Sequence, residues 1–254
     1  MRSTARVLAL LLLAAAPPLF AQNGWLDSLV KNTQVLPRTT RVIEVMGTMR
    51  NFTSALGVRC PFCHVGREGM ELEQFDFASD QKRNKLVARQ MMLMVQEIGR
   101  RVDTIPDRTA GLQVTCFTCH RGLSRPVPLS TVLIDAATAA GADSAIRAYR
   151  ALRERYYGRD AYDFGEPSLN TAAFRLGRAG RFDDALAILQ LNATNFPGSS
   201  GMEVFRGNIL LMRGDTTGAA EAFREAVKRD STNQEARGRF ATIGRQPLAV
   251  RPAA

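Results

Sequence analysis

Apolar side chains recur at steps of three and four residues in several parts of the chain, a spacing that places them on one face of an α-helix. The stretch from Thr40 to Leu56 has this pattern, and the Gly57 that follows is of the type that commonly ends helices. Its apolar positions are Val42, Met46, Met49, Phe52 and Leu56. The pattern therefore predicts a helix with one apolar face over residues 40–56.

A second helix is predicted to start at Ser79 or Asp80, either of which can cap it, and to run to Ile98, with Gly99 as its stop. Its apolar face comprises Val87, Met91, Met94 and Ile98. A loop follows each of these two helices and leads to a pentapeptide that contains two cysteines. The same plan, a helix, a loop and a pentapeptide, is thus used twice.

All four cysteines and both histidines of the chain lie in the two pentapeptides, residues 60–64 and 116–120. Each has the pattern Cys-x-x-Cys-His, which is typical of c-type haem attachment. The spacing suits that chemistry, because two thiols add to two vinyl groups on one edge of a porphyrin and the next residue brings an imidazole to the iron. The sequence therefore predicts two covalently bound c-type haems. The predicted tethers and proximal ligands are Cys60, Cys63 and His64 for one haem, and Cys116, Cys119 and His120 for the other.

Three other uses of paired cysteines were considered. A structural zinc ion can be held by four thiolates, but zinc ribbons separate the pairs by fewer residues and need no histidine after each pair. A thioredoxin-like redox motif needs one pair within a βαβ pattern, which the sequence does not show. Two disulfides are compatible with an exported chain, although cysteines this close rarely pair with each other. The haem interpretation is favoured over all three.

An iron in a c-type haem usually takes a sixth ligand, and both histidines are already used as proximal ligands. A methionine thioether is the natural remaining candidate, and histidine–methionine ligation raises the reduction potential. Five of the nine methionines lie on the two helices that precede the pentapeptides: Met46, Met49, Met91, Met92 and Met94. Packing in a helical core is the alternative explanation, and the residues alone leave both open.

Residues 49–64, and residues 88–98 followed by 116–120, resemble the haem-binding units of the photosynthetic reaction-centre cytochrome c subunit family. In that family, a methionine on the helix before each pentapeptide supplies the sixth iron ligand. The resemblance implies Met49 for the first haem and Met94 for the second, with Met46 and Met91, one helical turn away, as alternatives. It covers roughly residues 34–128. The subunits that give the family its name hold four haems and are often lipid-anchored, whereas this chain has two motifs.

The second half of the chain carries helical periodicity from about Ser130 to Tyr157 and then an echo with a period of 34 residues. The matched pairs are Gly180 with Gly214, Ala185 with Ala219, Leu189 with Phe223, and Pro197 with Ser231. This period resembles that of tetratricopeptide repeats. Because at least three repeats are usually needed for stability, helices at 130–157 and 233–243 are expected to cap the stack. The repeats either support the haem domain or form a groove that docks a protein or peptide.

These patterns predict an all-α fold, with a small helical dihaem cytochrome c domain followed by a short tetratricopeptide-like solenoid. The extended segment Arg125-Pro126-Val127-Pro128 is a plausible boundary. We expect a signal peptide over residues 1–21, the cytochrome domain over 22–128, a helical connector over 129–167 and the repeats with a capping helix over 168–254.

Residues 1–21 have the features of a secretory signal peptide: Arg2 and Arg6, then an apolar run from Val7 to Ala16, then a small residue at Ala21. Export agrees with the cysteines, because c-type haem is attached outside the cytoplasm. The mature protein is expected to be periplasmic. An uncleaved N-terminal anchor is the alternative.

The formal net charge is +10, and the arginines are scattered through the chain, which argues against nucleic acid as a ligand. A basic surface can steer an acidic redox partner, although a solvated basic face without a function is equally compatible. We expect an electron carrier between a protein donor and a protein acceptor, with a membrane-bound photosynthetic or respiratory complex as a candidate partner. The alternatives are a haem enzyme or gas sensor with one open iron site, and a scaffold whose repeats dock a partner.

Overall fold

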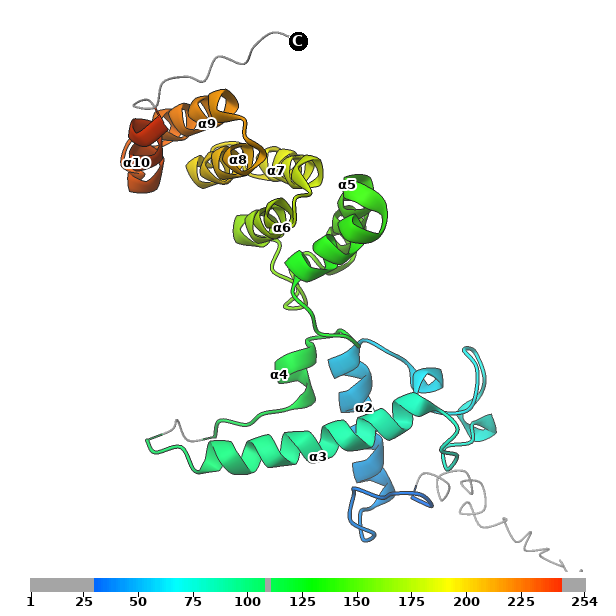
Figure 1. Cartoon of the computed structure of the whole chain (residues 1–254). Helices are drawn as coiled ribbons and strands as arrows, with labels where there is room; N and C mark the ends of the chain where they lie inside the picture. Colours follow the sequence, from blue (N-terminus) through cyan, green and yellow to red (C-terminus); the bar gives the residue numbers. More distant parts are fainter. Residues whose placement is uncertain (1–29, 108–110, 244–254) are drawn as a thin grey trace, which may run out of the picture. The chain divides into compact units, whose positions relative to one another are not determined.

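The computed structural model describes residues 30–107 and 111–243, which contain helices joined by loops and no β-strand (Figure 1). The prediction of an all-α fold is confirmed. The predicted signal peptide, residues 1–21, lies outside the described residues.

The chain divides into two compact units, of which one ends at Thr118 and the other begins at Cys119. This division falls inside the second pentapeptide, earlier in the chain than the predicted boundary after Pro128. The functional division into a cytochrome domain and a repeat domain stays a prediction.

The first long helix, α2 (Val42–Leu56), agrees with the predicted one. At its start, the Glu44 carboxylate accepts hydrogen bonds from the backbone N–H of Arg41 at 3.0 Å and from the Arg41 guanidinium at 2.8 Å. At its end, Gly57 adopts the left-handed conformation with φ 65°, in which glycine carries no steric penalty. Both ends of α2 are therefore determined by residues next to it in the sequence.

The second long helix, α3 (Arg83–Asp103), begins and ends later than predicted, so both predicted ends were wrong. Neither Ser79 nor Asp80 caps it: the Ser79 hydroxyl binds a backbone N–H two residues on, and Asp80 forms ion pairs with two side chains of α3. Gly99 lies inside the helix. The cost of a helical glycine is about 1 kcal/mol, and the ion pairs of Glu97 with Arg100 and Arg101 offset part of it.

The first unit has a small core of its own. Its buried apolar side chains are those of Val45, Ala55, Phe75 and Phe77, and two short 3₁₀ helices, η1 (Cys60–Phe62) and η2 (Leu72–Gln74), lie in the segment between α2 and α3. No residue of α3 is buried, although the helix is 21 residues long. Among the described residues, close helix–helix packing is confined to the second unit. The helices of the first unit therefore lack the apolar cover that an amphipathic helix normally requires.

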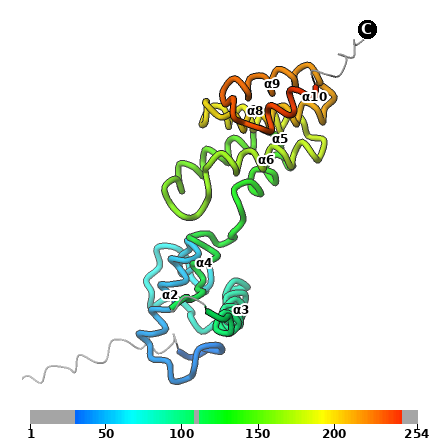
Figure 2. The backbone as a smooth tube through the Cα atoms, turned by 90° about the vertical axis from the view of Figure 1, so that its left-hand side faces the viewer, coloured from blue at the N-terminus to red at the C-terminus, as the bar shows by residue number. Residues whose placement is uncertain are grey.

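The second unit is a succession of helices that pack on their neighbours (Figure 2). They are α5 (Leu129–Tyr156), α6 (Glu166–Arg178), α7 (Phe182–Asn195), α8 (Ser200–Arg213), α9 (Thr216–Arg229) and α10 (Gln234–Ile243). A further short helix, α4 (Cys116–His120), spans the division between the units. The predicted flanking helices at 130–157 and 233–243 correspond to α5, which is kinked at Ala140 and Gly141, and to α10.

The 34-residue echo corresponds to two successive helix pairs. Helices α6 and α8 begin 34 residues apart, as do α7 and α9. Gly180 and Gly214 form the turns within the pairs with φ of 77° and 87°, and Ala185 and Ala219 are both fully buried. A helical repeat is thus present in this unit, and its assignment to the tetratricopeptide class stays a prediction.

Among residues 30–107 and 111–243, no helix combines the length and the hydrophobicity needed to cross a bilayer.

Candidate cofactor sites

The first pentapeptide forms a single tight turn at η1. The backbone N–H groups of Cys63 and His64 both donate to the carbonyl of Cys60, at 3.1 and 2.9 Å. This turn brings the two half-buried thiols and the imidazole to consecutive positions around one loop. Pro61 at the start of η1 favours the turn, because its fixed φ suits a helical first position.

The loop that follows holds the imidazole in place. Asp76 donates its backbone N–H to the carbonyl of Val65 at 3.0 Å, which closes the loop into an isolated β-bridge. Phe77 therefore meets His64 edge to face, with ring centroids 5.0 Å apart. Phe75 stacks on Phe77 at 5.5 Å. Within this loop, the position after Val65 must be glycine, because a Cβ at Gly66 would collide with the Phe75 ring.

His64 is buried and electrically neutral near neutral pH. Its pKa is lowered to about 4, first by burial and then by the charge of Lys85, against the opposing effects of a hydrogen bond with the Phe77 backbone and of the Asp76 carboxylate. Its Nδ1 is buried and has no hydrogen-bond partner. A neutral imidazole keeps one nitrogen lone pair, which is what a metal ion requires of a histidine.

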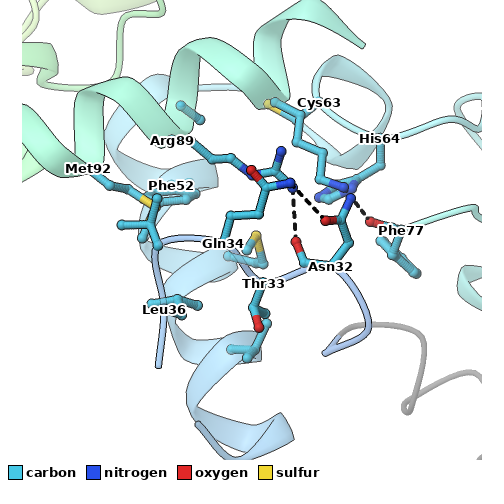
Figure 3. Close-up of a pocket in the computed structure, with 15 residues that line it drawn as sticks. Asn32, Thr33, Gln34, Leu36, Phe52, Cys63, His64, Phe77, Arg89 and Met92 are labelled. Atoms are coloured by element: carbon cyan, nitrogen blue, oxygen red, sulfur yellow. Dashed lines mark hydrogen bonds between the residues drawn. The ribbon is translucent and has the colours of Figure 1, made fainter. Parts of the chain in front are cut away.

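Two cavities of about 80 and 190 Å³, both partly open to solvent, adjoin this loop. Five residues line both of them: Met49, Phe52, Cys63, His64 and Phe77. The first cavity, which is shown in Figure 3, extends from α2 to α3 and has predominantly apolar walls.

Three methionines line these cavities, and they are not equivalent. Met49 on α2 lines both cavities, together with Cys63 and His64. Met46, the alternative one turn earlier, lines only the second cavity, and Met92 on α3 lines only the first (Figure 3). The structure thus brings Met49 and the first pentapeptide to the walls of the same hollow.

One part of the first cavity is polar. Arg89 on α3 donates to the backbone carbonyl of Asn32 at 2.9 Å and to the carboxylate of Asp80 at 2.9 Å. The Asn32 side chain in turn donates to the Asp80 carboxylate at 2.9 Å. It also accepts a hydrogen bond from Gln34 at 3.1 Å (Figure 3). The hydrogen bond from Arg89, reinforced by those from Asn32 and Lys85, holds the pKa of Asp80 far below its usual range.

The second pentapeptide is helical and forms α4. Arg121 and Gly122, with φ of 49° and 87°, turn the chain back so that the Leu123 carbonyl lies 2.7 Å from Nδ1 of His120. With Nδ1 as the donor, Nε2 carries the lone pair, and this arrangement is the one that orients metal-binding histidines. The Cys119 thiol is exposed and Cys116 is half-buried.

Met91 and Met94, the residues predicted for the second haem, line neither of the two cavities. Met94 lies on the face of α3 opposite to Met92, because two residues along a helix correspond to a rotation of about 200°, and Met91 lies about 100° from Met92. The side chains of Met91 and Met94 are 39% and 47% exposed, and the neighbouring Val87 is 40% exposed. An apolar face of α3 is therefore left without cover within the first unit.

The donor set and the cavities fit a haem at the first pentapeptide. Two thiols, a neutral buried imidazole and a thioether are arranged around hollows that are mainly apolar. Within residues 30–107 and 111–243, no group of three or more His, Cys, Asp or Glu side chains converges on a common metal position. A haem does not need such a group, because the porphyrin supplies four nitrogen ligands to its own iron.

Comparison with known protein families identifies the middle of the chain. Residues 71–151 match the family of the photosynthetic reaction centre cytochrome C subunit. The match includes α3 and the second pentapeptide and begins after the first one. The family resemblance predicted from the sequence is confirmed over this range. It indicates a haem-binding cytochrome with covalently bound c-type haem, an electron carrier that works with protein redox partners. No curated protein matches the chain.

Sequence reasoning missed several residues of the first cavity. Asn32, Gln34, Lys85 and Arg89 were not assigned to it, and Met92 was noted without a site. Lys85 and Arg89 are four residues apart, so the sequence alone places them on the same face of the predicted helix. That face carries few apolar residues. Nothing in the local sequence indicated that the segment around Asn32 would lie beside Lys85 and Arg89.

Proposed function

We propose that this chain is a periplasmic dihaem c-type cytochrome that transfers single electrons between protein partners. The observation that carries the proposal is the convergence of Met49, Cys63 and His64 on two adjoining cavities. The family match, which includes the second pentapeptide, supports it independently.

In the proposed first site, Cys60 and Cys63 would hold the haem through two thioether bonds, each formed by addition of S–H across one vinyl group. No net oxidation or reduction is involved. His64 supplies the proximal nitrogen and Met49 the distal sulfur. When bound, the haem supplies an iron that gains or loses one electron. Phe77, packed edge to face against His64, keeps water from the imidazole.

In the proposed second site, Cys116 and Cys119 are the tethers and His120 is the proximal ligand. The hydrogen bond from His120 Nδ1 to the Leu123 carbonyl supports this role, because it leaves Nε2 for the iron. Met94 is proposed as the distal ligand, with Met91 as the alternative. The uncovered apolar face of α3 supports a large apolar group next to these methionines.

An electron carrier follows from the ligand set, because an iron with histidine on one side and methionine on the other has no position for substrate. A haem enzyme or gas sensor is the second candidate. The exposure of Met94, 47%, favours it at the second haem, since an exposed and unclamped ligand is the one most easily displaced. The helical pairs α6–α9 are proposed to support the cytochrome unit or to dock a partner, and a membrane-bound photosynthetic or respiratory complex is a candidate acceptor or donor.

The first experiment produces the full chain with a c-type haem maturation system and determines the number of haems per chain by mass and by the alkaline pyridine spectrum. Two covalent haems are expected. The paired variants Cys60→Ser with Cys63→Ser and Cys116→Ser with Cys119→Ser should each lose one haem and retain the other. Chains without haem, or with haem that organic solvent extracts, would contradict the proposal.

Carbon monoxide separates the two candidate functions. If both irons carry histidine and methionine, the spectrum of the reduced protein should not change when the gas is added. A change in the bands of one haem would identify an open or displaceable position, and the enzyme or sensor function would then be preferred.

A further inference from the structure

Two cationic side chains line the first cavity and are largely, but not fully, shielded from solvent. Lys85 and Arg89, one turn apart on α3, are 12% and 11% exposed. The acidic group that pairs with them is Asp80. The wall of the cavity therefore carries an excess of one positive charge. A buried charge is costly unless it is paired, so an anionic group of a ligand is expected here.

The two cations differ in the hydrogen bonds that they still have available. The Lys85 ammonium donates to the backbone carbonyls of Phe77, Ala78 and Ser79 at 3.0, 2.9 and 2.9 Å and also pairs with Asp80 at 3.1 Å. An ammonium has three N–H donors, so Lys85 is fully used. Its contacts hold residues 77–79 against α3.

Arg89 is not fully used. Its guanidinium makes hydrogen bonds to the Asp80 carboxylate and to the Asn32 carbonyl, both at 2.9 Å. A guanidinium has five N–H donors, so several remain for a group in the cavity, and its fork matches the geometry of a carboxylate. Asp80 and Asn32 thus hold the guanidinium through these two hydrogen bonds.

We infer that Arg89 binds a propionate carboxylate of the first haem, and that Asp80 and Asn32 are positioning residues that orient it. The inference rests on the proposed function and goes further, because it assigns a residue outside the pentapeptides to the non-covalent recognition of the cofactor. The apolar walls then accept the macrocycle, and the polar end formed by α3 and the segment at Asn32 accepts its charged edge.

This role has an electrostatic consequence that can be measured. A fixed positive charge close to a haem disfavours the oxidised state, which carries one more positive charge than the reduced state. Arg89 therefore raises the reduction potential of the first haem, and Asp80 lowers it.

The test compares four variants of the full chain, each matured with both haems: Arg89→Gln, Arg89→Lys, Asp80→Asn and Arg100→Gln. The last is the control, because Arg100 lies on the same helix, is 74% exposed and lines neither cavity. Potentiometric titration followed by visible spectroscopy gives the midpoint potential of each haem.

For Arg89→Gln we expect the reduced-to-oxidised ratio of one haem to fall about tenfold at fixed potential, which is 59 mV for a one-electron couple. Asp80→Asn should shift the same haem in the opposite direction. Arg89→Lys should restore most of the wild-type value, and Arg100→Gln should leave both haems unchanged. If Arg89 and Asp80 had only a structural role, either substitution would loosen the site and admit water. Because water favours the oxidised state, the potential would then fall in both Arg89→Gln and Asp80→Asn.

A shift of the same sign in those two variants, or no shift in either, would overturn the inference while two haems per chain would still support the proposed function. Loss of covalent haem from the wild-type chain would instead refute the proposed function itself.

Discussion

At the scale of single residues, the two proposed proximal histidines are held in different ways. His64 is buried against Phe77, and its pKa is lowered to about 4 because burial opposes the charged form. His120 is only half-buried, and its Nδ1 is fixed by the Leu123 carbonyl at 2.7 Å. A hydrogen bond at Nδ1 makes the imidazole a stronger electron donor. The two haems are therefore expected to have distinct potentials and to titrate in two resolved steps.

Met49 is the residue whose removal most directly tests the first site. Met49→Leu keeps the volume and removes the thioether, so the first iron should lose its sixth ligand, bind carbon monoxide and fall in potential. Visible spectroscopy of the reduced protein, with and without the gas, measures the change. Met46→Leu is the matched control, since Met46 lies on the same helix and lines only the second cavity. If the two variants exchange phenotypes, Met46 is the ligand.

Met94→Leu should act on the other haem. We expect carbon monoxide to bind one haem per chain, as in Met49→Leu, but with a different set of bands, and the double variant should bind it at both. Met91→Leu serves as the control, because both side chains belong to the same exposed face of α3. An unaltered spectrum in Met94→Leu together with an altered one in Met91→Leu would transfer the assignment to Met91.

Asp80 makes the first unit sensitive to acid. Its pKa in the folded protein lies below the ordinary value of 3.8, mainly because of the hydrogen bond from Arg89. A carboxyl group with a depressed pKa stabilises the fold at pH values above 3.8, and this contribution is lost as the pH falls from there through the lower, folded-state pKa. Hydrogen exchange at amides of α3, measured between pH 5 and the acid limit of the fold, should show this loss. The slope should be smaller in Asp80→Asn, and equal slopes would contradict the prediction.

The residue types and spacing of the pentapeptides lead to a prediction of c-type haem that the family match supports, because covalent attachment fixes the order of thiols and imidazole in the sequence. They were not sufficient to predict Arg89 and Asn32. These residues lie far apart in the chain and meet only because the segment before α2 folds against α3, a contact that no local pattern encodes.

At the scale of elements, α3 has two distinct faces, and the sequence indicated only one. The apolar face with Val87, Met91 and Met94 follows the helical period and was predicted. The face with Lys85, Arg89 and Met92 has mixed polarity and lines the first cavity. Because a face of mixed polarity produces no hydrophobic period in the sequence, this face could be recognised only from the residues that line the cavity.

The pairing of α8 with α9 depends on a glycine. A Cβ at Gly207 would lie 2.6 Å from the ring of Phe223, which is fully buried. Gly207→Ala should therefore destabilise this helix pair by about 1–3 kcal/mol, the usual cost of overpacking a core. Hydrogen exchange at the amides of α8 and α9 in the full chain measures the effect.

Gly238→Ala is the matched control for that substitution. Gly238 lies in α10, is exposed, and has no heavy atom within 4 Å of an added Cβ. Alanine there should stabilise the unit by about 0.5–1 kcal/mol, because glycine is unfavourable inside a helix. Equal effects of the two substitutions would mean that helix propensity, and not the contact with Phe223, decides the outcome at position 207.

At the scale of the whole molecule, the two units were predictable to different degrees. The 34-residue period was sufficient to predict the two successive helix pairs of α6–α9, because each pair has the same local interactions. The first unit was less predictable in its packing, since its helices make few contacts with one another and border open cavities. If the proposed haem fills these cavities, the cofactor forms part of the core, and sequence patterns cannot predict packing against a group outside the chain.

The net charge leads to a prediction about electron exchange. The formal charge of +10 includes Arg2 and Arg6 of the predicted signal peptide, and haem carboxylates offset part of the remainder, so the mature protein stays positive. Electrostatic attraction then favours negatively charged reaction partners and is screened by salt, with a Debye length of about 30 Å at 0.01 M and about 8 Å at 0.15 M ionic strength. Oxidation of the reduced protein by an anionic metal complex should therefore slow between these two conditions, whereas oxidation by a cationic complex should accelerate. Stopped-flow spectroscopy measures both rates.

If both rates vary with salt in the same direction, or neither varies, the scattered arginines do not act as a steering surface. Recognition of a partner must then depend on a local contact such as the helical repeats.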